Sequence, residues 1–252
     1  WVIEVRQYFI LKIDHAFVDP ESNAFAKSLL FGIKSDGVTL NTPSIQKAID
    51  FISEKGGGKL KFYVGRYLTG SIQLKSNVTI ELNEGAVLVG TPSIYDYVGA
   101  NGMKALIVAD GQQNIGVLGK GVIEGQGPAV LEQIAKQIQK GYLQETISQA
   151  SPALIALNNC SGVNIEGFNL QNACGNVIAL TACKQVRLAG LKIKSMSNKE
   201  TKGLVISKVD GIKLENLFIE TVASEIKSDG LSTNISMVNC QYASGKKLIF
   251  KN

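Results

Sequence analysis

Hydrophobic and polar residues alternate in short blocks along the second half of the chain, and these blocks recur. Four segments share the order apolar, polar, apolar, two others, apolar, polar, apolar: 160–170, 183–193, 209–219 and 232–242. Their first apolar residues, spaced by 23, 26 and 23 positions, are Val163, Val186, Ile212 and Ile235. Each block predicts two short strands joined by a two-residue bend.

The residue before the first apolar position is Asn or Gly in five of six copies, when two earlier copies are included. The six residues are Asn77, Asn114, Gly162, Gln185, Gly211 and Asn234. Asn and Gly tolerate a left-handed backbone better than other residues do. The pattern therefore predicts a turn with positive φ once in every repeat.

A repeat of about 23 residues cannot bury its apolar side alone and must stack on its neighbours. Short strands and tight turns in each unit predict an all-β fold, a single-stranded right-handed parallel β-helix. The leucine-rich repeat is the main alternative, but its leucine and asparagine spacing is missing. Cys160 and Cys183 fall at equivalent positions, so we expect free thiols stacked inside the coil; a disulfide between them is the open alternative.

Two segments interrupt the repeat with helical periodicity. Residues 42–58 predict a helix with Thr42 as N-cap, Pro43 in the first turn and Gly56 after its end. Its apolar face, formed by Ile45, Ala48, Ile49 and Ile52, predicts an N-terminal capping helix on the open end of the array.

The second interruption, 127–141, carries Val130, Leu131, Ile134 and Ile138 on one face. It stretches the interval between equivalent apolar positions to 48 residues. Insertions of this kind usually lie on one face of a solenoid, often beside its binding groove.

These elements predict one β-helix domain over 1–252, with a cap region at 31–58, coils over 59–252 and a helical insertion at 127–150. Whether residues 1–30 belong to the first coil stays open. Residues 1–10 alternate well enough to form an edge strand, and they could equally pair with another chain.

Composition narrows the classes of function. The net charge of +5 is mild and scattered, and no aromatic platform accompanies the basic residues, so no nucleic-acid site is expected. No apolar run approaches the roughly 20 residues of a membrane span. The four cysteines form no C-x-x-C pair and His15 is the one histidine, so we predict no metal site and no cofactor. No leader is visible; in an exported protein it would have been removed or would lie outside this sequence.

Residues 31–90, 105–127 and 151–173 together resemble the polygalacturonase-like glycoside hydrolases of family 28. The likeness extends over about residues 31–245, and the stretch GKGVIEGQG (119–127) points to the polygalacturonase branch. The resemblance implies a secreted or periplasmic protein that handles uronate-rich, plant-type polysaccharide or oligosaccharide. It also implies hydrolysis by two carboxylates on one sheet face.

The family's catalytic motifs are altered at every corresponding position. Its Asn-Thr-Asp-Gly falls on 200–203, so that Lys202 stands where the resemblance implies Asp. Its Gly-Asp-Asp turn falls on 220–228, with Ala223 and Ser224 at the acidic positions. Its histidine falls near Lys246, and the sequence ends at Asn252 before an Arg-x-Lys pair. The resemblance therefore implies a relative whose catalytic acids are replaced.

Charged residues still follow the two coils on which the family binds sugar. The candidates for this groove are Glu200, Lys202, Glu225, Lys227 and Asp229. The first interpretation is a non-catalytic, carbohydrate-binding relative, in which these charges solvate a turn and a strand face. The second is an active hydrolase that pairs Glu200 with Glu225 or Asp229. A pectin-type lyase with Lys202 or Lys227 as base is a third, although no Asp cluster suited to its usual calcium lies nearby.

Overall fold

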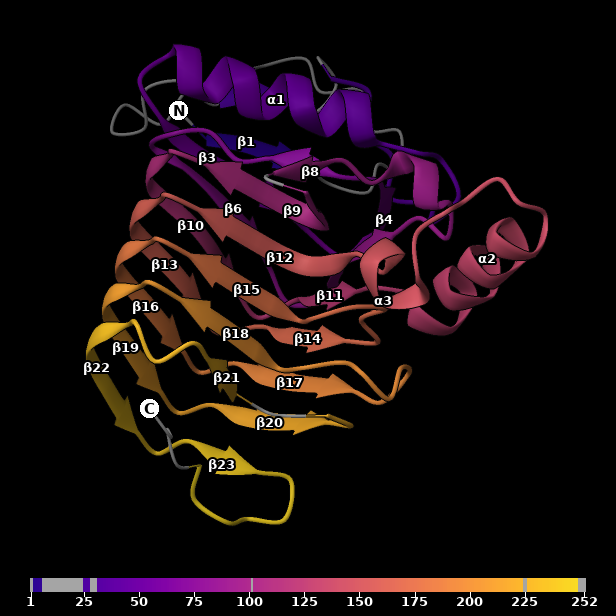
Figure 1. Cartoon of the computed structure of the whole chain (residues 1–252). Helices are drawn as coiled ribbons and strands as arrows, with labels where there is room; N and C mark the ends of the chain where they lie inside the picture. Colours follow the sequence, from indigo (N-terminus) through magenta and orange to yellow (C-terminus); the bar gives the residue numbers. More distant parts are fainter. Residues whose placement is uncertain (1, 6–24, 28–30, 101, 224–225, 249–252) are drawn as a thin grey trace.

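The strands of the computed structural model wind through three parallel sheets, one coil stacked on the next (Figure 1). The structure describes residues 2–5, 25–27, 31–100, 102–223 and 226–248. Sheet A contains, in spatial order, β2 (Phe25–Lys27), β1 (Val2–Val5), β3 (Gly58–Phe62), β6 (Val78–Leu82), β10 (Gln113–Gly119), β13 (Ser161–Glu166), β16 (Lys184–Ala189), β19 (Asp210–Glu215) and β22 (Thr233–Val238).

Each coil then continues through two further sheets. Sheet B contains β4 (Gly65–Thr69), β7 (Ala86–Gly90), β11 (Val122–Glu124), β14 (Asn169–Gln171), β17 (Lys192–Ser195), β20 (Phe218–Thr221) and β23 (Gln241–Tyr242). Sheet C contains β5 (Ile72–Gln73), β9 (Met103–Asp110), β12 (Ala153–Asn158), β15 (Ile178–Thr181), β18 (Leu204–Ser207) and β21 (Ile226–Ser228). A two-residue strand, β8 (Gly99–Ala100), pairs antiparallel with β9. The predicted parallel β-helix is confirmed.

The alternating apolar residues point inward and stack from coil to coil. One column in sheet A consists of Ile80, Val117, Ile165, Leu188 and Leu214, all in register and all buried. Burying such a side chain stabilises the fold by about 1.5–3 kcal/mol. A single unit has no partner for these side chains, which is why the repeats must stack.

The predicted left-handed turn position is confirmed in all six copies. The φ angles are 64° at Asn77, 53° at Asn114, 65° at Gly162, 53° at Gln185, 76° at Gly211 and 53° at Asn234. Neighbouring copies also bond: Asn114 Nδ2 donates to Asn77 Oδ1 at 3.1 Å. A second set of positive φ angles, at Asn159, Ala182 and Lys208, lies in the turn from sheet C to sheet A and was not predicted.

Helix α1 (Thr42–Glu54) lies across the N-terminal end of the stack (Figure 1). Ile45, Ala48, Ile49 and Ile52 are fully buried, as the periodicity predicted. The predicted N-cap is wrong by one residue, because Asn41 occupies that position and Thr42 is already helical. The Thr42 hydroxyl instead accepts a hydrogen bond from the Gly70 N–H at 2.6 Å, which ties the helix to the first coil.

The insertion between β11 and β12 forms α2 (Gly127–Gln139) and the short α3 (Ile147–Ala150). Val130 and Ile134 of α2 are buried against Ile94, in the 3₁₀ turn Ile94–Asp96, and against Cys174. Leu131 and Ile138 are partly buried at the same contact. The apolar face predicted for this helix therefore packs on the outside of the coils.

Strand β1 lies between β2 and β3 and pairs with both in parallel. The prediction of a strand within residues 1–10 thus holds for Val2–Val5, but the strand is not an edge, because β2 lies outside it. The other residues of that segment, and His15, lie outside the described part of the chain.

All four cysteines carry free thiols, and all are buried. Cys160 and Cys183 stand directly before β13 and β16 at equivalent positions, and the Lys184 N–H donates to the Cys160 carbonyl at 2.8 Å. The stacking of free thiols is confirmed, and the alternative of a disulfide between them is wrong.

Candidate functional site

Two parallel rows of side chains follow the outer face of sheet C; the ends of each row are exposed and the middle is largely buried. The first, which we call the outer row, follows the strand register from coil to coil and consists of Gln73, Val108, Ala156, Ala179, Val205 and Lys227. Side chains on one face of a strand recur at every second residue, so this row is fixed by the pairing register. Its polar and cationic members lie at its two ends, with small apolar residues between them.

The second row, which we call the polar row, lies two residues further along each strand. Its register-paired members, together with the residue that follows β21, are Asp110, Asn158, Thr181, Ser207 and Asp229. Asn158 Nδ2 donates to Asp110 Oδ1 at 2.7 Å, and Ser207 Oγ donates to Asp229 Oδ2 at 2.7 Å. The row offers carboxylate, amide and hydroxyl groups on five consecutive coils, which suits recognition of a hydroxylated ligand.

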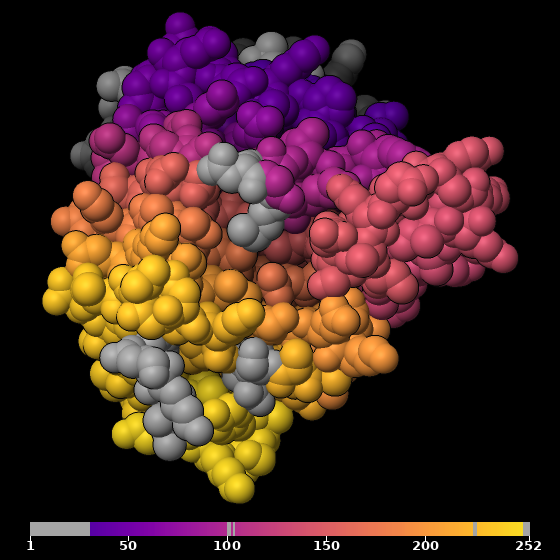
Figure 2. All heavy atoms as spheres, viewed as in Figure 1, coloured from indigo at the N-terminus to yellow at the C-terminus, as the bar shows by residue number. Residues whose placement is uncertain are grey.

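The helical insertion projects beside this face, and the surface between it and the coils is hollowed (Figure 2). Lys104 of β9 forms an ion pair with Glu145, in the loop between α2 and α3, at 2.8 Å. Beside this contact Ala105, Val108, Ala153 and Ala156 form a buried apolar cluster. The insertion therefore forms a wall of the face rather than a cover over all of it.

Two of the predicted groove residues, Glu200 and Lys202, lie in the turn that leads into β18. The Glu200 N–H donates a hydrogen bond to Asn198 Oδ1 at 3.1 Å, and the Glu200 carboxylate is exposed. Lys202 Nζ donates to the Glu200 carbonyl oxygen at 3.3 Å. Thr201 between them is fully buried, and its hydroxyl has no hydrogen-bond partner within the described residues.

Lys227 and Asp229 lie one coil further, at the C-terminal end of the face, and both are exposed. The Ser207 hydroxyl and the Leu231 N–H both donate to Asp229 and hold its pKa below the usual range. Glu225, the fifth predicted residue, lies outside the described part of the chain, as does Ser224. Ala223 is exposed, and its N–H donates to the Thr201 carbonyl at 3.1 Å.

Glu200 and Asp229 lie at opposite ends of strand β18. Glu200 precedes Leu204, where the strand begins, whereas Asp229 bonds to Ser207, where it ends. A strand advances about 3.3 Å per residue, so β18 alone separates the two ends by about 10 Å. The two residues are thus attached to the backbone further apart than the roughly 6.5–9.5 Å that separates the two carboxyl groups of inverting glycosidases.

Lys246, which stands near the family's histidine position, follows β23 in sheet B rather than a strand of sheet C. It lines a cavity of about 390 Å³ together with Glu220 and Tyr242. The structure thus does not place Lys246 among the side chains of the two rows.

Of the polar row the sequence pointed only to Asp229, although the chain contains a signal for three other members. Asn158, Thr181 and Ser207 each precede the positive-φ residue of the turn into sheet A, so aligning the repeats on that turn would have placed them together. Within the described ranges, no group of three His, Cys, Asp or Glu side chains is arranged to hold a metal ion. None of the helices described is long and apolar enough to cross a membrane.

Comparison with known proteins identifies the family and agrees with the fold. The sequence profile of glycosyl hydrolases family 28 matches residues 35–248. The chain belongs to this family. A crystal structure of a protein described as a candidate glycosyl hydrolase from Parabacteroides merdae ATCC 43184 is 46% identical in sequence and superposes with a TM-score of 0.83, covering 87% of this chain and 98% of that one.

More distant relatives carry named activities. The exo-poly-alpha-D-galacturonosidase of Dickeya chrysanthemi is 25% identical over 244 residues, which cover 85% of this chain and 40% of that protein. The family 28 exopolygalacturonase of Yersinia enterocolitica shares the fold, with a TM-score of 0.71 and 21% identity over 85% of this chain and 48% of that one. This family 28 chain spans 40% or less of the length of the first three curated relatives that it matches.

Proposed function

We propose that this family 28 chain binds uronate-rich polysaccharide on the outer face of sheet C without hydrolysing it. The observation that carries the proposal is Lys202, a cation at the position where the family resemblance implies a catalytic carboxylate. A lysine is fully protonated near neutral pH unless burial lowers its pKa, and it then attracts a uronate carboxylate instead of protonating a glycosidic oxygen.

Asp229 does not suit the role of the acid in glycosidic catalysis. A general acid must keep its proton near neutral pH, which requires a raised pKa. Asp229 has a lowered pKa, because hydroxyl and backbone donors stabilise its charged form. Its distance from Glu200 along β18 also disfavours the two as an acid and base pair. These observations argue against relocation of the active site to Glu200 and Asp229.

Binding, by contrast, needs only groups of the right kind along the face. Lys202 and Lys227 supply charge for uronate carboxylates, and the polar row supplies acceptors and donors for sugar hydroxyls. The substrate class comes from family 28 and from the galacturonosidase relative, and a secreted or periplasmic location is the setting in which such a polymer is met.

The test compares turnover with binding on the same samples. Reducing-sugar and unsaturated-product assays on polygalacturonate and rhamnogalacturonan should give no turnover, while a titration with the same polymers should show binding. Lys202→Gln combined with Lys227→Gln should weaken binding by tenfold or more, since each change removes a charge-assisted contact.

Lys120→Gln is the matched control, because Lys120 is an exposed lysine in the turn between sheets A and B. Reducing ends that appear with the wild type and decline in Glu200→Gln would establish a hydrolase and overturn the proposal. Unsaturated products would establish a lyase. Absence of any binding would likewise contradict a carbohydrate-binding role.

A further inference from the structure

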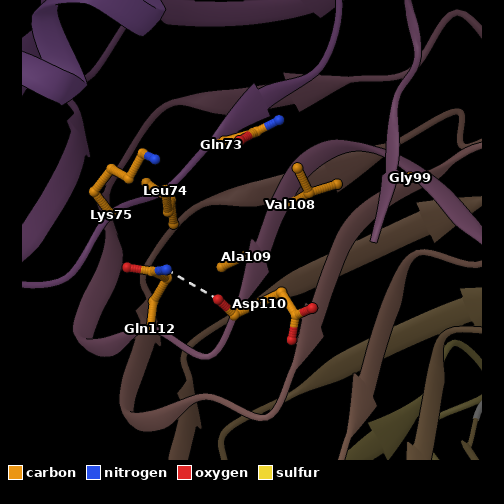
Figure 3. A pocket seen from close by; sticks show the side chains of 8 residues that line it. All are labelled: Gln73, Leu74, Lys75, Gly99, Val108, Ala109, Asp110 and Gln112. Atoms are coloured by element: carbon orange, nitrogen blue, oxygen red, sulfur yellow. Dashed lines mark hydrogen bonds between the residues drawn. The ribbon is translucent and has the colours of Figure 1, made fainter. Parts of the chain in front are cut away.

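A pocket of about 270 Å³ lies at the N-terminal end of the same face, several coils away from Lys202 and Lys227 (Figure 3). It is lined by Gln73, Leu74 and Lys75 around β5, by Val108, Ala109, Asp110 and Gln112 around β9, and by Gly99 of β8. Pockets for drug-sized ligands have volumes of about 300–1,000 Å³, so this one suits a single sugar ring rather than a longer oligomer.

Two polar side chains of the pocket are free to bind a ligand. Neither the Lys75 ammonium nor the Gln73 amide group has a hydrogen bond or ion pair with any residue that the structure describes, although the Gln73 backbone is bonded to Gln46 of α1. In Figure 3 Lys75 lies on one side of the pocket and Val108 on the other, with Gln73 between them. A cation without a counter-ion beside a free amide is a ready site for a carboxylate.

The other polar side chains are already fixed in place. Gln112 Oε1 accepts from the Ser76 N–H at 2.8 Å, and its Nε2 donates to the Asp110 carbonyl at 2.9 Å. The Asp110 carboxylate accepts from Asn158 at 2.7 Å. Side chains held in this way lose little freedom when a ligand binds, which favours affinity.

We propose that this pocket binds one hexuronate residue, with the sugar carboxylate on Lys75 and Gln73. The ring would lie against Val108, and its hydroxyls would donate to Asp110. A ligand with two or more negative charges is less suitable, because Asp110 is an anion in the same small pocket. The choice of a uronate rests on the proposed function, whereas the need for a singly charged carboxylate comes from the pocket itself.

The pocket is separate from the lysine pair of the proposed function. Gln73 and Lys227 are the two ends of the outer row and are separated by five strand-to-strand steps. Neighbouring strands lie about 4.8 Å apart, so the two ends are about 24 Å apart. A monosaccharide therefore reaches the pocket without touching Lys202 or Lys227, and a long polymer could engage both.

The test is a titration of the whole chain with D-galacturonate, followed by amide chemical shifts, with D-galactose as the uncharged ligand. We expect galacturonate to shift the amide signals of Val108 and Ala109, and Lys75→Gln to weaken its binding by tenfold or more. Gln73→Ala should weaken it by a smaller factor. Lys120→Gln, which removes the same charge far from the pocket, should leave the affinity unchanged.

Three results would overturn the proposal: no binding of galacturonate to the wild type, equal binding to wild type and Lys75→Gln, or equal affinity for galactose and galacturonate. Polymer binding is scored separately through Lys202 and Lys227. A wild-type protein that binds galacturonate but no polymer would contradict the proposed function alone. A wild-type protein that binds polymer but no galacturonate would contradict only the pocket.

Discussion

The Ser207 hydroxyl donates a hydrogen bond of 2.7 Å to the carboxylate of Asp229, across one coil of sheet C. The bond links Ser207, the last residue of β18, to Asp229, the residue that follows β21. It also helps to keep the pKa of Asp229 below its usual range. One contact therefore connects the stacking of the coils with the charge of the face on which we propose that sugar binds.

Ser207→Ala should raise the pKa of Asp229 toward the ordinary value of an aspartate, because the largest stabilising donor is removed. A carboxylate with a lowered folded pKa stabilises the fold above its unfolded pKa, near 3.9, and this stabilisation is lost as the pH falls through the folded pKa. Carboxyl-carbon chemical shifts followed during an acid titration measure the change.

Thr233→Ala provides the matched control for this titration. The hydroxyl of Thr233, in β22, donates to Asp210, in β19, and is the largest cause of the lowered pKa of Asp210. Thr233→Ala should raise the pKa of Asp210 and leave the pKa of Asp229 unchanged. An Asp229 pKa that is the same in Ser207→Ala and wild type would show that its backbone donors alone determine it.

Glu124→Ala should destabilise the fold, because three donors converge on this buried carboxylate. They are the Gln126 N–H at 3.0 Å, Gln171 Nε2 at 2.6 Å and Asn172 Nδ2 at 3.0 Å. Gln126 and Gln171 are half-buried and Asn172 is exposed, so water replaces part of the lost contacts. Since hydrogen bonds to a charged group contribute about 1.5–3 kcal/mol each, we expect a net loss of about 1–3 kcal/mol. For a chain of this size that lowers the melting temperature by about 2–4 °C per kcal/mol, which calorimetry detects.

Glu132→Ala is the comparison, since Glu132 pairs with Lys136 on the exposed surface of α2 and such pairs contribute little. Its melting temperature should equal that of the wild type. Equal melting temperatures for Glu124→Ala and Glu132→Ala would mean that water replaces the lost carboxylate at Glu124.

The stacked coils could be predicted because two independent features of the sequence repeat with the same period. One is the set of inward apolar residues, and the other is the Asn or Gly at the turn. Asn114 and Gly162 could be assigned positive φ because few other residue types adopt it without cost. Ala182 and Lys208 share that conformation, yet nothing in their chemistry favours it. Packing of the flanking strands imposes their backbone, and a local pattern does not contain that information.

The candidate site was predicted less completely, for a related reason. The positions of Glu200 and Lys202 followed from a motif that is continuous in sequence. The pocket at Gln73 and Lys75 depends on Asp110 and Gln112, about 35 residues away, which the register of β5 and β9 brings together. The number of residues between β5 and β9 is set by the long connection that contains β8. It therefore differs from the repeat period, and no repeat pattern relates the two sides of the pocket.

Ala182→Gly should stabilise the protein by about 0.5–1 kcal/mol. A non-glycine residue in the left-handed region costs about 1–2 kcal/mol, and the greater flexibility of glycine in the unfolded chain offsets part of the gain. Ala182 has a φ of 52°. Ala179→Gly, the same change in the buried part of β15, should destabilise instead, because Gly weakens a strand. Chemical denaturation of both variants would contradict this account if they shifted in the same direction.

The four thiols should be unreactive toward a thiol reagent such as DTNB until the chain unfolds. Each is no more than 1% exposed, and burial raises the pKa of Cys174 to about 11 and also raises that of Cys240, which lowers the fraction of reactive thiolate. The Cys183 side chain lowers the pKa of Cys160 to about 7, so at Cys160 the protection comes from burial against the reagent alone. We expect no thiols to react in native buffer and four to react in denaturant without reductant. The variant Lys199→Cys, at an exposed position before β18, should have one additional thiol that reacts at once in native buffer. A count of two in denaturant would reveal a disulfide and contradict the free, stacked thiols on which the inner packing of these coils depends.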